Sequence, residues 1–128
     1  MMPKNFQKHD AAKLRYELTP VAIEEAIADI FTYGAEKYDA WNWLQDDAEW
    51  SRIYGALRRH LAAHWSGEFL DQESGRPHLA HVLVNTGFLL IHAQNGSGID
   101  DRPGARAEKI MQKIREEQER PHPANGKA

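Results

Sequence analysis

The chain has 128 residues, 41 % of them apolar and 27 % charged, which is typical of one soluble globular domain with a real core. Its net charge of −3 gives no support for binding to nucleic acid or to an anionic membrane. Cysteine is absent, which excludes disulfides and thiolate zinc sites, and no apolar run approaches the roughly 20 residues of a membrane span. The start of the chain has no apolar signal segment, so the expected location is the cytoplasm.

Residues 1–19 are mixed and polar and predict an N-terminal arm. This arm has two interpretations: a solvated segment, or a strap that carries Lys13 and Arg15 over a phosphate. A helix is expected from Pro20 to Tyr38, because apolar residues recur there with a 3.6-residue period. Thr19 is the candidate N-cap of this helix.

Residues 39–47 form a connecting loop that holds two tryptophans around Asn42. The indoles either pack in the core or offer a stacking surface to a nucleobase whose edge Asn42 would read. The loop alone does not decide between the two. Asp46 or Asp47 is expected to cap a second helix that runs to Gly67 or, at its longest, to Asp71.

A third, strongly apolar helix is expected from Pro77 to Gln94, with Asn95-Gly96 as its C-cap signal. A fourth, starting at Pro103 or Gly104 and ending near Arg120, has a narrow apolar strip suited to packing on the domain edge or on a second subunit. No alternating strand pattern occurs, so the prediction is a single all-α domain, a small bundle of about four helices. Its parts are an arm (1–19), a catalytic helical core (20–95), a C-terminal helix (96–120) and a disordered tail (121–128).

Two polar stripes are the sharpest functional signal in the sequence. On the second helix, extended to Asp71, four polar residues fall within an arc of roughly 80°, and on the third helix three fall within roughly 60°. The first stripe comprises His60, His64, Glu68 and Asp71, and the second comprises His78, His81 and Asn85. Folding at the turn between the helices predicts three pairs: Asp71 with His78, Glu68 with His81, and His64 with Asn85.

Carboxylates and imidazoles gathered in this way make a natural site for a divalent cation, although any one histidine is more often a hydrogen-bonded core residue. The sequence lacks the HExxH motif of zincins, the paired ExxH motifs of ferritin-like di-iron proteins, and a His-Asp doublet inside a helix. A cation with basic groups and an aromatic slot around it favours hydrolysis of a nucleoside polyphosphate. The alternatives are a non-catalytic nucleotide- or metal-binding protein and a structural bundle whose histidines satisfy one another.

Four segments resemble the phage dATP/dGTP diphosphohydrolase family: KHDAAKLRYEL, FTYGAEKYDAWNW, LRRHLAAHWSGEFLDQESG and PHLAHVLVNTGFLL. Members of this family, some of them called MazZ, look like distant relatives of the MazG-type all-α nucleotide pyrophosphohydrolases. The resemblance covers residues 8–92. It implies a MazG-like architecture and metal-dependent hydrolysis of dGTP, dATP or both to the monophosphate and pyrophosphate. Together with the narrow apolar strip of the fourth helix, the resemblance suggests a homo-oligomer, a dimer or tetramer. The net charge and the lack of a membrane span predict no nucleic-acid or membrane partner.

The resemblance further implies a setting for this reaction. In phages that replace adenine with 2-aminoadenine, the reaction supplies dGMP for the modified base and depletes competing nucleotides. A phage-encoded chain would act in the host cytoplasm.

MazG-type enzymes usually present ExxE on one helix and ExxD on the next. Here Glu68 and Asp71 form ExxD, whereas His78 and His81 form HxxH where a later acidic motif would fall. The expected ligands of Mg²⁺, Mn²⁺ or Co²⁺ are therefore Glu68, Asp71 and His78, completed by His81 or Glu73, with Glu36 as a further alternative.

The expected reaction is attack of an activated water on the α-phosphorus, with a cluster carboxylate (Glu68 or Asp71) or His60 as the base. Basic side chains would neutralise the phosphates, and polar and aromatic side chains would contact the base and sugar. The phosphate set is Lys13, Arg15, Lys37 and Arg59, and the remaining substrate-binding candidates are Tyr38, Asn42, Trp43 and Asn85.

Overall fold

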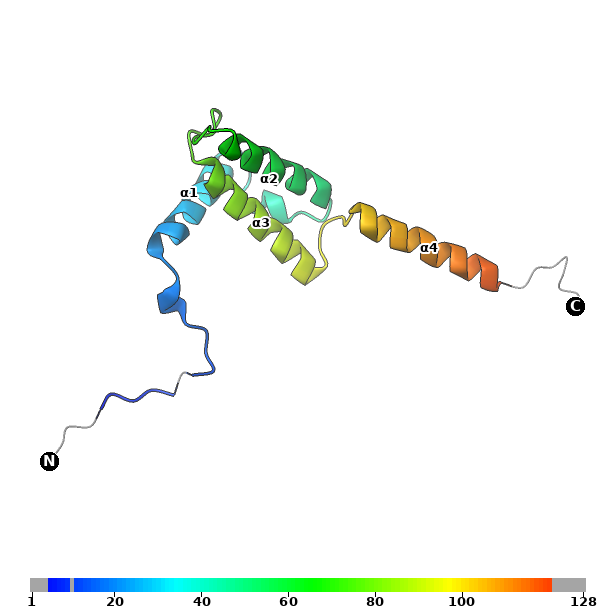
Figure 1. The fold of residues 1–128 in the computed structure, drawn as a ribbon, viewed down its shortest axis with the longest axis horizontal. Helices are drawn as coiled ribbons and strands as arrows, with labels where there is room; N and C mark the ends of the chain where they lie inside the picture. Colours follow the sequence, from blue (N-terminus) through cyan, green and yellow to red (C-terminus); the bar gives the residue numbers. More distant parts are fainter. Residues whose placement is uncertain (1–4, 10, 121–128) are drawn as a thin grey trace, which may run out of the picture.

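The computed structural model describes residues 5–9 and 11–120, so the predicted disordered tail (121–128) lies outside the described residues. The described residues form four α-helices: α1 (Val21–Lys37), α2 (Trp50–Trp65), α3 (His78–Asn95) and α4 (Pro103–Glu119). Two single 3₁₀ turns, η1 (Tyr16–Leu18) and η2 (Asn42–Leu44), precede α1 and α2. Apart from two isolated bridges, this part of the chain has no strand, and the predicted all-α class is confirmed (Figure 1).

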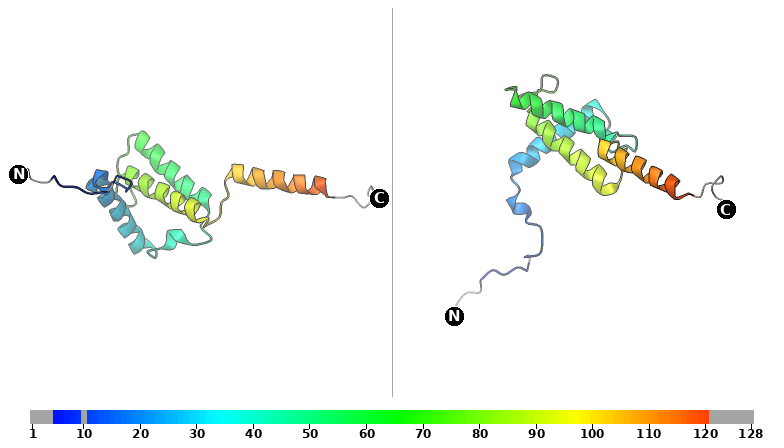
Figure 2. Two further views of the ribbon diagram at one scale, coloured as in Figure 1. Left: turned by 90° about the horizontal axis from the view of Figure 1, so that it is seen from below. Right: turned by 45° about the vertical axis from the view of Figure 1, so that its right-hand side comes forward.

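Helix α3 lies at the centre of the fold, with its largest interface on α2 and a smaller one on α1 (Figures 1 and 2). The core is small: Ile30 of α1 packs on Ala80 and Val84 of α3, and Phe31 and Phe88 close its edge. Burial of these apolar surfaces holds α1 against α3. Helices α1 and α2 thus flank the same central helix.

Helix α2 is shorter than predicted at both ends. Glu49, and neither Asp46 nor Asp47, occupies its N-cap position, and the side-chain capping oxygen comes from Asp101, which accepts a 2.8 Å bond from the Ser51 N–H. The helix ends at Trp65 because Gly67 adopts φ 103, a conformation that reverses the chain. The expected extension to Asp71 is therefore wrong.

The ends of α1 and α3 follow the predicted bounds closely. Pro20, rather than the predicted Thr19, sits at the N-cap position of α1, with no side-chain capping bond. Gly96 ends α3 in the left-handed region (φ 66), and its N–H donates to the His92 carbonyl, as the Asn95-Gly96 signal predicts.

Helix α4 and the segment before α1 both extend away from the three packed helices (Figures 1 and 2). The apolar strip of α4, formed by Ile110, Met111 and Ile114, is 40–53 % exposed, so it does not pack on the edge of its own domain. Among the described helices, none combines the length and apolar character needed to cross a membrane.

Candidate functional site

Three histidines from two helices meet where the first turn of α3 passes α2. The His60 and His78 Nδ1 atoms are 2.9 Å apart, and the His60 ring stacks on the His81 ring with centroids at 4.3 Å and an interplanar angle of 6°. His78 and His81 are both buried, at 4 % and 9 % exposure. His60 is half-buried. Enclosing three imidazoles together is costly unless each has a partner, so their other contacts are informative.

The carboxylates of the site come from the loop between α2 and α3, and not from the face of a helix. An antiparallel bridge between Leu70 and Pro77 closes this loop, and the Asp71 N–H donates to the Arg76 carbonyl at 2.8 Å. Glu68 accepts a 3.0 Å hydrogen bond from His78 Nε2, while Asp71 Oδ2 lies 3.9 Å from His81 Nε2.

The predicted pairing register is therefore shifted. Glu68 bonds to His78 instead of the expected His81, because a loop with its own bridge replaces the last helical turn. The expected contact of His64 with Asn85 is also absent from the described residues: Asn85 Nδ2 donates to the His81 carbonyl, and the buried His64 Nδ1 has no partner there.

Donor atoms of His60, Asp71 and His78 all lie within 4.8 Å of one another, as the ligands of one metal ion do. Because Glu68 accepts from Nε2 of His78, the Nδ1 lone pair of that ring is available to His60 or to a cation, which is how carboxylates orient metal-binding imidazoles. Two imidazoles and a carboxylate suit a divalent ion such as Mn²⁺ or Co²⁺. The residues present therefore fit the expected cation.

The electrostatics of the cluster favour the forms that bind metal. Burial, together with neighbouring positive charge, lowers the pKa of His60 and of His81 below the usual range, so both rings stay neutral near pH 7. Partial burial pushes the pKa of Asp71 upward, but hydrogen bonds from Ser74 and the nearby histidines outweigh this, and the net pKa is lowered. The cluster therefore combines neutral imidazoles with an ionised carboxylate.

Sequence reasoning missed Ser74, which lies at the centre of the loop. Its hydroxyl is 2.7 Å from His81 Nε2, and its N–H donates to Asp71 Oδ2 at 2.8 Å, so it links these two predicted site residues. Arg76 fastens the same loop to α1 by an ion pair with Asp29 (3.1 Å) and by stacking over Tyr33 (4.7 Å). A serine in a turn carries no functional signal of its own, and Asp29 and Arg76 are 47 residues apart.

A cavity of about 410 Å³ opens beside the histidines, between α1, α2, α3 and η2. Its size suits a small-molecule ligand, and apolar residues of α1 and α3, including Ile30 and Val84, line it together with polar groups. Ten predicted site residues line it: Lys37, Tyr38, Asn42, Trp43, Arg59, His60, Asp71, Glu73, His81 and Asn85. The structure thus brings most of the predicted set to one cavity.

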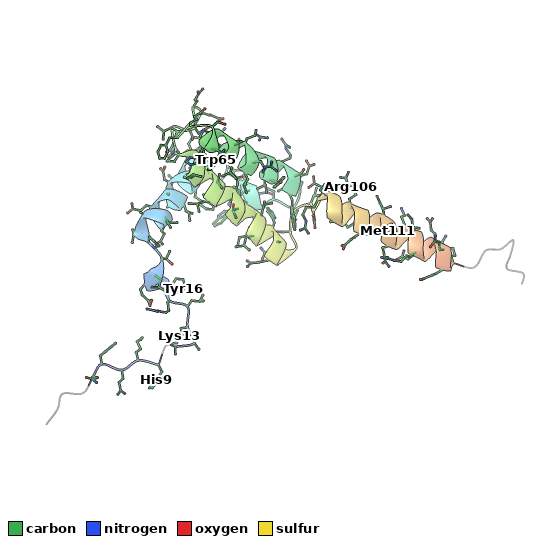
Figure 3. The ribbon with its side chains drawn as sticks, in the orientation of Figure 1. His9, Lys13, Tyr16, Trp65, Arg106 and Met111 are labelled. Carbon is green, nitrogen blue, oxygen red and sulfur yellow. The ribbon has the colours of Figure 1, made fainter. Side chains whose placement is uncertain are left out.

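Two predicted phosphate ligands lie elsewhere. Lys13 and Arg15 belong to the segment that runs away from the helices (Figure 3), and Arg15 pairs with Glu17 at 2.8 Å. At the cavity, Lys37 forms an ion pair with Glu73, which raises the pKa of Lys37 above its usual range.

The two tryptophans of the loop before α2 have different environments. Trp43 stacks on Phe88 with ring centroids at 4.7 Å and an interplanar angle of 14°, and the edge of Phe31 meets it at 5.9 Å. Trp41 is 66 % exposed. Trp43 therefore both packs on the core and lines the cavity, so the two interpretations of the loop do not exclude each other.

Comparison with known proteins supports the same family as the sequence motifs. A family model described as "dATP/dGTP diphosphohydrolase, N-terminal" matches residues 3–102. A dATP/dGTP diphosphohydrolase of Salmonella phage PMBT28 is 28 % identical over 108 residues, which cover 80 % of this chain and 37 % of the relative. The chain thus spans little more than a third of that relative's length, and no solved structure matches it. Because this family model matches more than half of the chain, the chain belongs to the dATP/dGTP diphosphohydrolase N-terminal family.

Proposed function

We propose that the chain hydrolyses purine deoxynucleoside triphosphates, dGTP, dATP or both, to the monophosphate and pyrophosphate. One observation carries the proposal: a single cavity is lined by His60, Asp71 and His81 of the cluster, by the basic groups Lys37 and Arg59, and by the aromatic ring of Trp43. Family membership and the name of the phage relative support the substrate class.

The residues proposed to hold a divalent cation (Mg²⁺, Mn²⁺ or Co²⁺) are His60, Asp71 and His78, with Glu68, Glu73 and His81 adjoining as further ligands. When bound, such a cation offsets the charge of the triphosphate and polarises its oxygens. Ser74 and Glu68 orient the imidazoles of His81 and His78 through their hydrogen bonds.

In the proposed reaction, a water oxygen forms a bond to the α-phosphorus, the bond from that phosphorus to the bridging oxygen breaks, and pyrophosphate leaves. A cluster carboxylate accepts the proton of the water. The alternative base is the neutral imidazole of His60, whose pKa burial lowers, in an arrangement in which another ligand of the cluster replaces His60 on the cation. Arg59 and Lys37 neutralise the phosphates, and a phosphate replaces Glu73 as the partner of Lys37.

Tyr38, Asn42, Trp43 and Asn85 are proposed to contact the base and sugar, since all four line the cavity. Lys13 and Arg15 contribute only if the N-terminal segment folds toward the cavity. Such a reaction acts on the deoxynucleotide pool of the cytoplasm, that of the host where the source is a phage. In a phage that makes 2-aminoadenine DNA, it would supply dGMP.

The same cavity and ligand cluster would also serve an alternative function, a nucleotide- or metal-binding protein without catalysis. Incubation with each of the four dNTPs and Mg²⁺, Mn²⁺ or Co²⁺, with chromatographic identification of the products, separates the two. We expect pyrophosphate and a purine monophosphate; binding of dGTP without any product would favour the alternative.

A purely structural cluster of histidines makes a different prediction for stability. If the cluster binds a cation, Mn²⁺ at 100 times its dissociation constant should stabilise the fold by about 2.7 kcal/mol, and EDTA should reverse this. A melting temperature that responds to neither would favour the structural interpretation.

We also propose that the chain forms a homo-oligomer, a dimer or tetramer. Leu79, Leu83 and Leu90 share the face of α3 opposite the cavity-lining residues and are 39–55 % exposed. The apolar strip of α4 is a second such surface. Sedimentation of the wild-type chain and of Leu83→Glu tests this: the variant should sediment as a smaller species, and an unchanged monomer in both would contradict it.

A further inference from the structure

His92 is fully buried, with 0 % of its surface exposed, and it takes no part in the proposed reaction. It lies on the last turn of α3, 14 residues and about 21 Å along the helix from His78. A buried imidazole at a helix end requires partners for both ring nitrogens. Both partners are present.

The hydrogen bonds of His92 assign its tautomer. Nε2 lies 2.7 Å from the carbonyl oxygen of Trp43, which can only accept, so Nε2 carries the proton. Nδ1 must then accept from the Ser97 hydroxyl, 2.8 Å away. Ser97 is held in turn because its carbonyl accepts the Trp50 indole N–H at 3.0 Å. His92 is thus a fixed donor aimed at the backbone of η2.

The segment that His92 contacts has few other anchors. The described backbone hydrogen bonds of residues 39–47 run within the segment, such as Asn42 N–H to Asp39 O, except for the one that the Ala48 N–H donates to Gln45 O. In this part of the chain, the His92 bond is the one hydrogen bond that ties the segment to a helix. Aromatic packing of Trp43 on Phe88 completes the attachment.

We propose that His92 is a positioning residue for the nucleobase: by holding the Trp43 carbonyl, it fixes the indole that lines the cavity and so determines purine preference. This inference rests on the proposed function, because it assigns Trp43 to the base. Loss of the bond leaves the half-buried Trp43 carbonyl without its donor and allows η2 to shift along Phe88, so that the base loses a stacking surface while the phosphate-binding residues are unchanged.

A matched pair of substitutions tests the bond itself. Glutamine is long enough to place its amide nitrogen near the position of Nε2 and can still donate to Trp43, whereas asparagine reaches only as far as Nδ1. In the full-length chain, His92→Asn should raise KM for dGTP and dATP roughly tenfold with kcat within about twofold, and His92→Gln should restore most of the loss. The ratio of kcat/KM for dGTP over dCTP should fall in His92→Asn.

Circular dichroism and the melting temperature of each variant separate this role from general destabilisation. A folded His92→Asn that keeps the wild-type KM and purine ratio, or one that loses kcat alone, overturns the proposal. If His92→Asn does not fold, Ser97→Ala takes its place: it removes only the hydroxyl that orients the ring, and an unchanged purine ratio in this variant also overturns it.

Failure of the proposed function has a separate signature. If the wild-type chain releases no product, dissociation constants for dGTP and dCTP, measured by quenching of tryptophan fluorescence, replace KM in the same comparison. A wild-type chain that neither hydrolyses nor binds any nucleotide overturns both proposals, whereas purine selectivity that His92→Asn leaves intact overturns only the role of His92.

Discussion

The histidines at the two ends of α3 differ in their hydrogen-bond partners. At its C-terminal end, the single ring of His92 has a carbonyl acceptor on one nitrogen and a hydroxyl on the other, so both ring nitrogens have hydrogen-bond partners. At its N-terminal end, three rings crowd together, and His60 and His78 use each other as partners. At the C-terminal end, the histidine has a structural role and both of its hydrogen bonds are made. The other end concentrates imidazoles and carboxylates beside a cavity.

This difference separates a structural histidine from a candidate functional one better than burial does. His92 and His78 are both buried, at 0 % and 4 % exposure. What distinguishes them is that His78 belongs to a set of donors close enough to share one cation, whereas His92 bonds only to groups that do not titrate near neutral pH. Each end of the helix can be tested separately, and the expected effects differ in kind.

The largest effect is expected from Asp71→Asn at the N-terminal end. Removal of the one carboxylate in the trio of donors should lower kcat at least about 100-fold while the fold persists, because the asparagine oxygen can still accept the Ser74 N–H. Asp101→Asn is the matched control: it weakens the cap of α2 without touching the cavity and should retain turnover. Wild-type rates of pyrophosphate release in Asp71→Asn would contradict the site.

The next effect concerns stability at the C-terminal end. A Cβ on Gly98 would lie 2.7 Å from the Ala48 carbonyl oxygen and 2.9 Å from His92 Nδ1, at a φ of +72°. Gly96 has a similar φ of +66°, but nothing lies within 4 Å of its Cβ position. Gly98→Ala should therefore lower the free energy of unfolding by about 3 kcal/mol and Gly96→Ala by about 1 kcal/mol. Urea denaturation measures both free energies, and equal losses would show that the surroundings of Gly98 are loosely packed.

Acid should destabilise the fold through the N-terminal cluster. Burial lowers the pKa of His60 and His81 in the folded state, so near pH 6 the unfolded chain binds more protons than the folded one. This contribution is present above the unfolded value of about 6.5 and is lost as pH falls through the folded pKa values. Melting temperatures in EDTA should fall from pH 7.5 to 5.5, and less steeply in a His60→Gln, His81→Gln double variant. Parallel slopes in the two proteins would exclude the cluster as the cause.

The smallest effect is expected from Asn42→Ala on the cavity wall between the two ends. Its side chain is exposed at the cavity, so loss of its hydrogen bonds to a base edge should change the ratio of kcat/KM for dGTP over dATP only about threefold to tenfold. Gln45→Ala, in the same loop but away from the cavity, should leave that ratio unchanged. Identical ratios in both variants would remove Asn42 from base recognition.

Much of the helical framework could be predicted from local patterns. The apolar period of α3 and its Asn95-Gly96 signal place that helix within one residue of its observed bounds. The ends of helix α2 were harder to predict, because one depends on a residue distant in the sequence and the other on the conformation of a glycine. The capping oxygen comes from Asp101, 50 residues away from Ser51. At the other end, the turn at Gly67 ends the helix, although polar residues continue at helical spacing in the sequence beyond it.

The candidate site shows the same division. Histidine spacing predicted two facing polar stripes that contain His60, His78 and His81, but none of the three predicted pairs included His60. In the structure, His60 contacts both His78 and His81. The partners of these rings lie in the loop between α2 and α3, whose conformation cannot be predicted from helical periodicity. For this reason the bond of Glu68 to His78 and the role of Ser74 were not predicted. His92 carried no signal either, because its partner Trp43 is 49 residues away and contributes only a backbone carbonyl.

By itself, the sequence determined the all-α class, the order of the helices, the family and the residue types of a candidate cation site, because helical periodicity and short motifs are local properties of the chain. Only the tertiary structure decided which carboxylate meets which imidazole, that Lys37, Arg59 and Trp43 line one cavity, and that His92 fastens its wall. Those contacts join residues far apart in the chain, and the packing of α1 and α2 on α3 is what brings them within hydrogen-bonding distance.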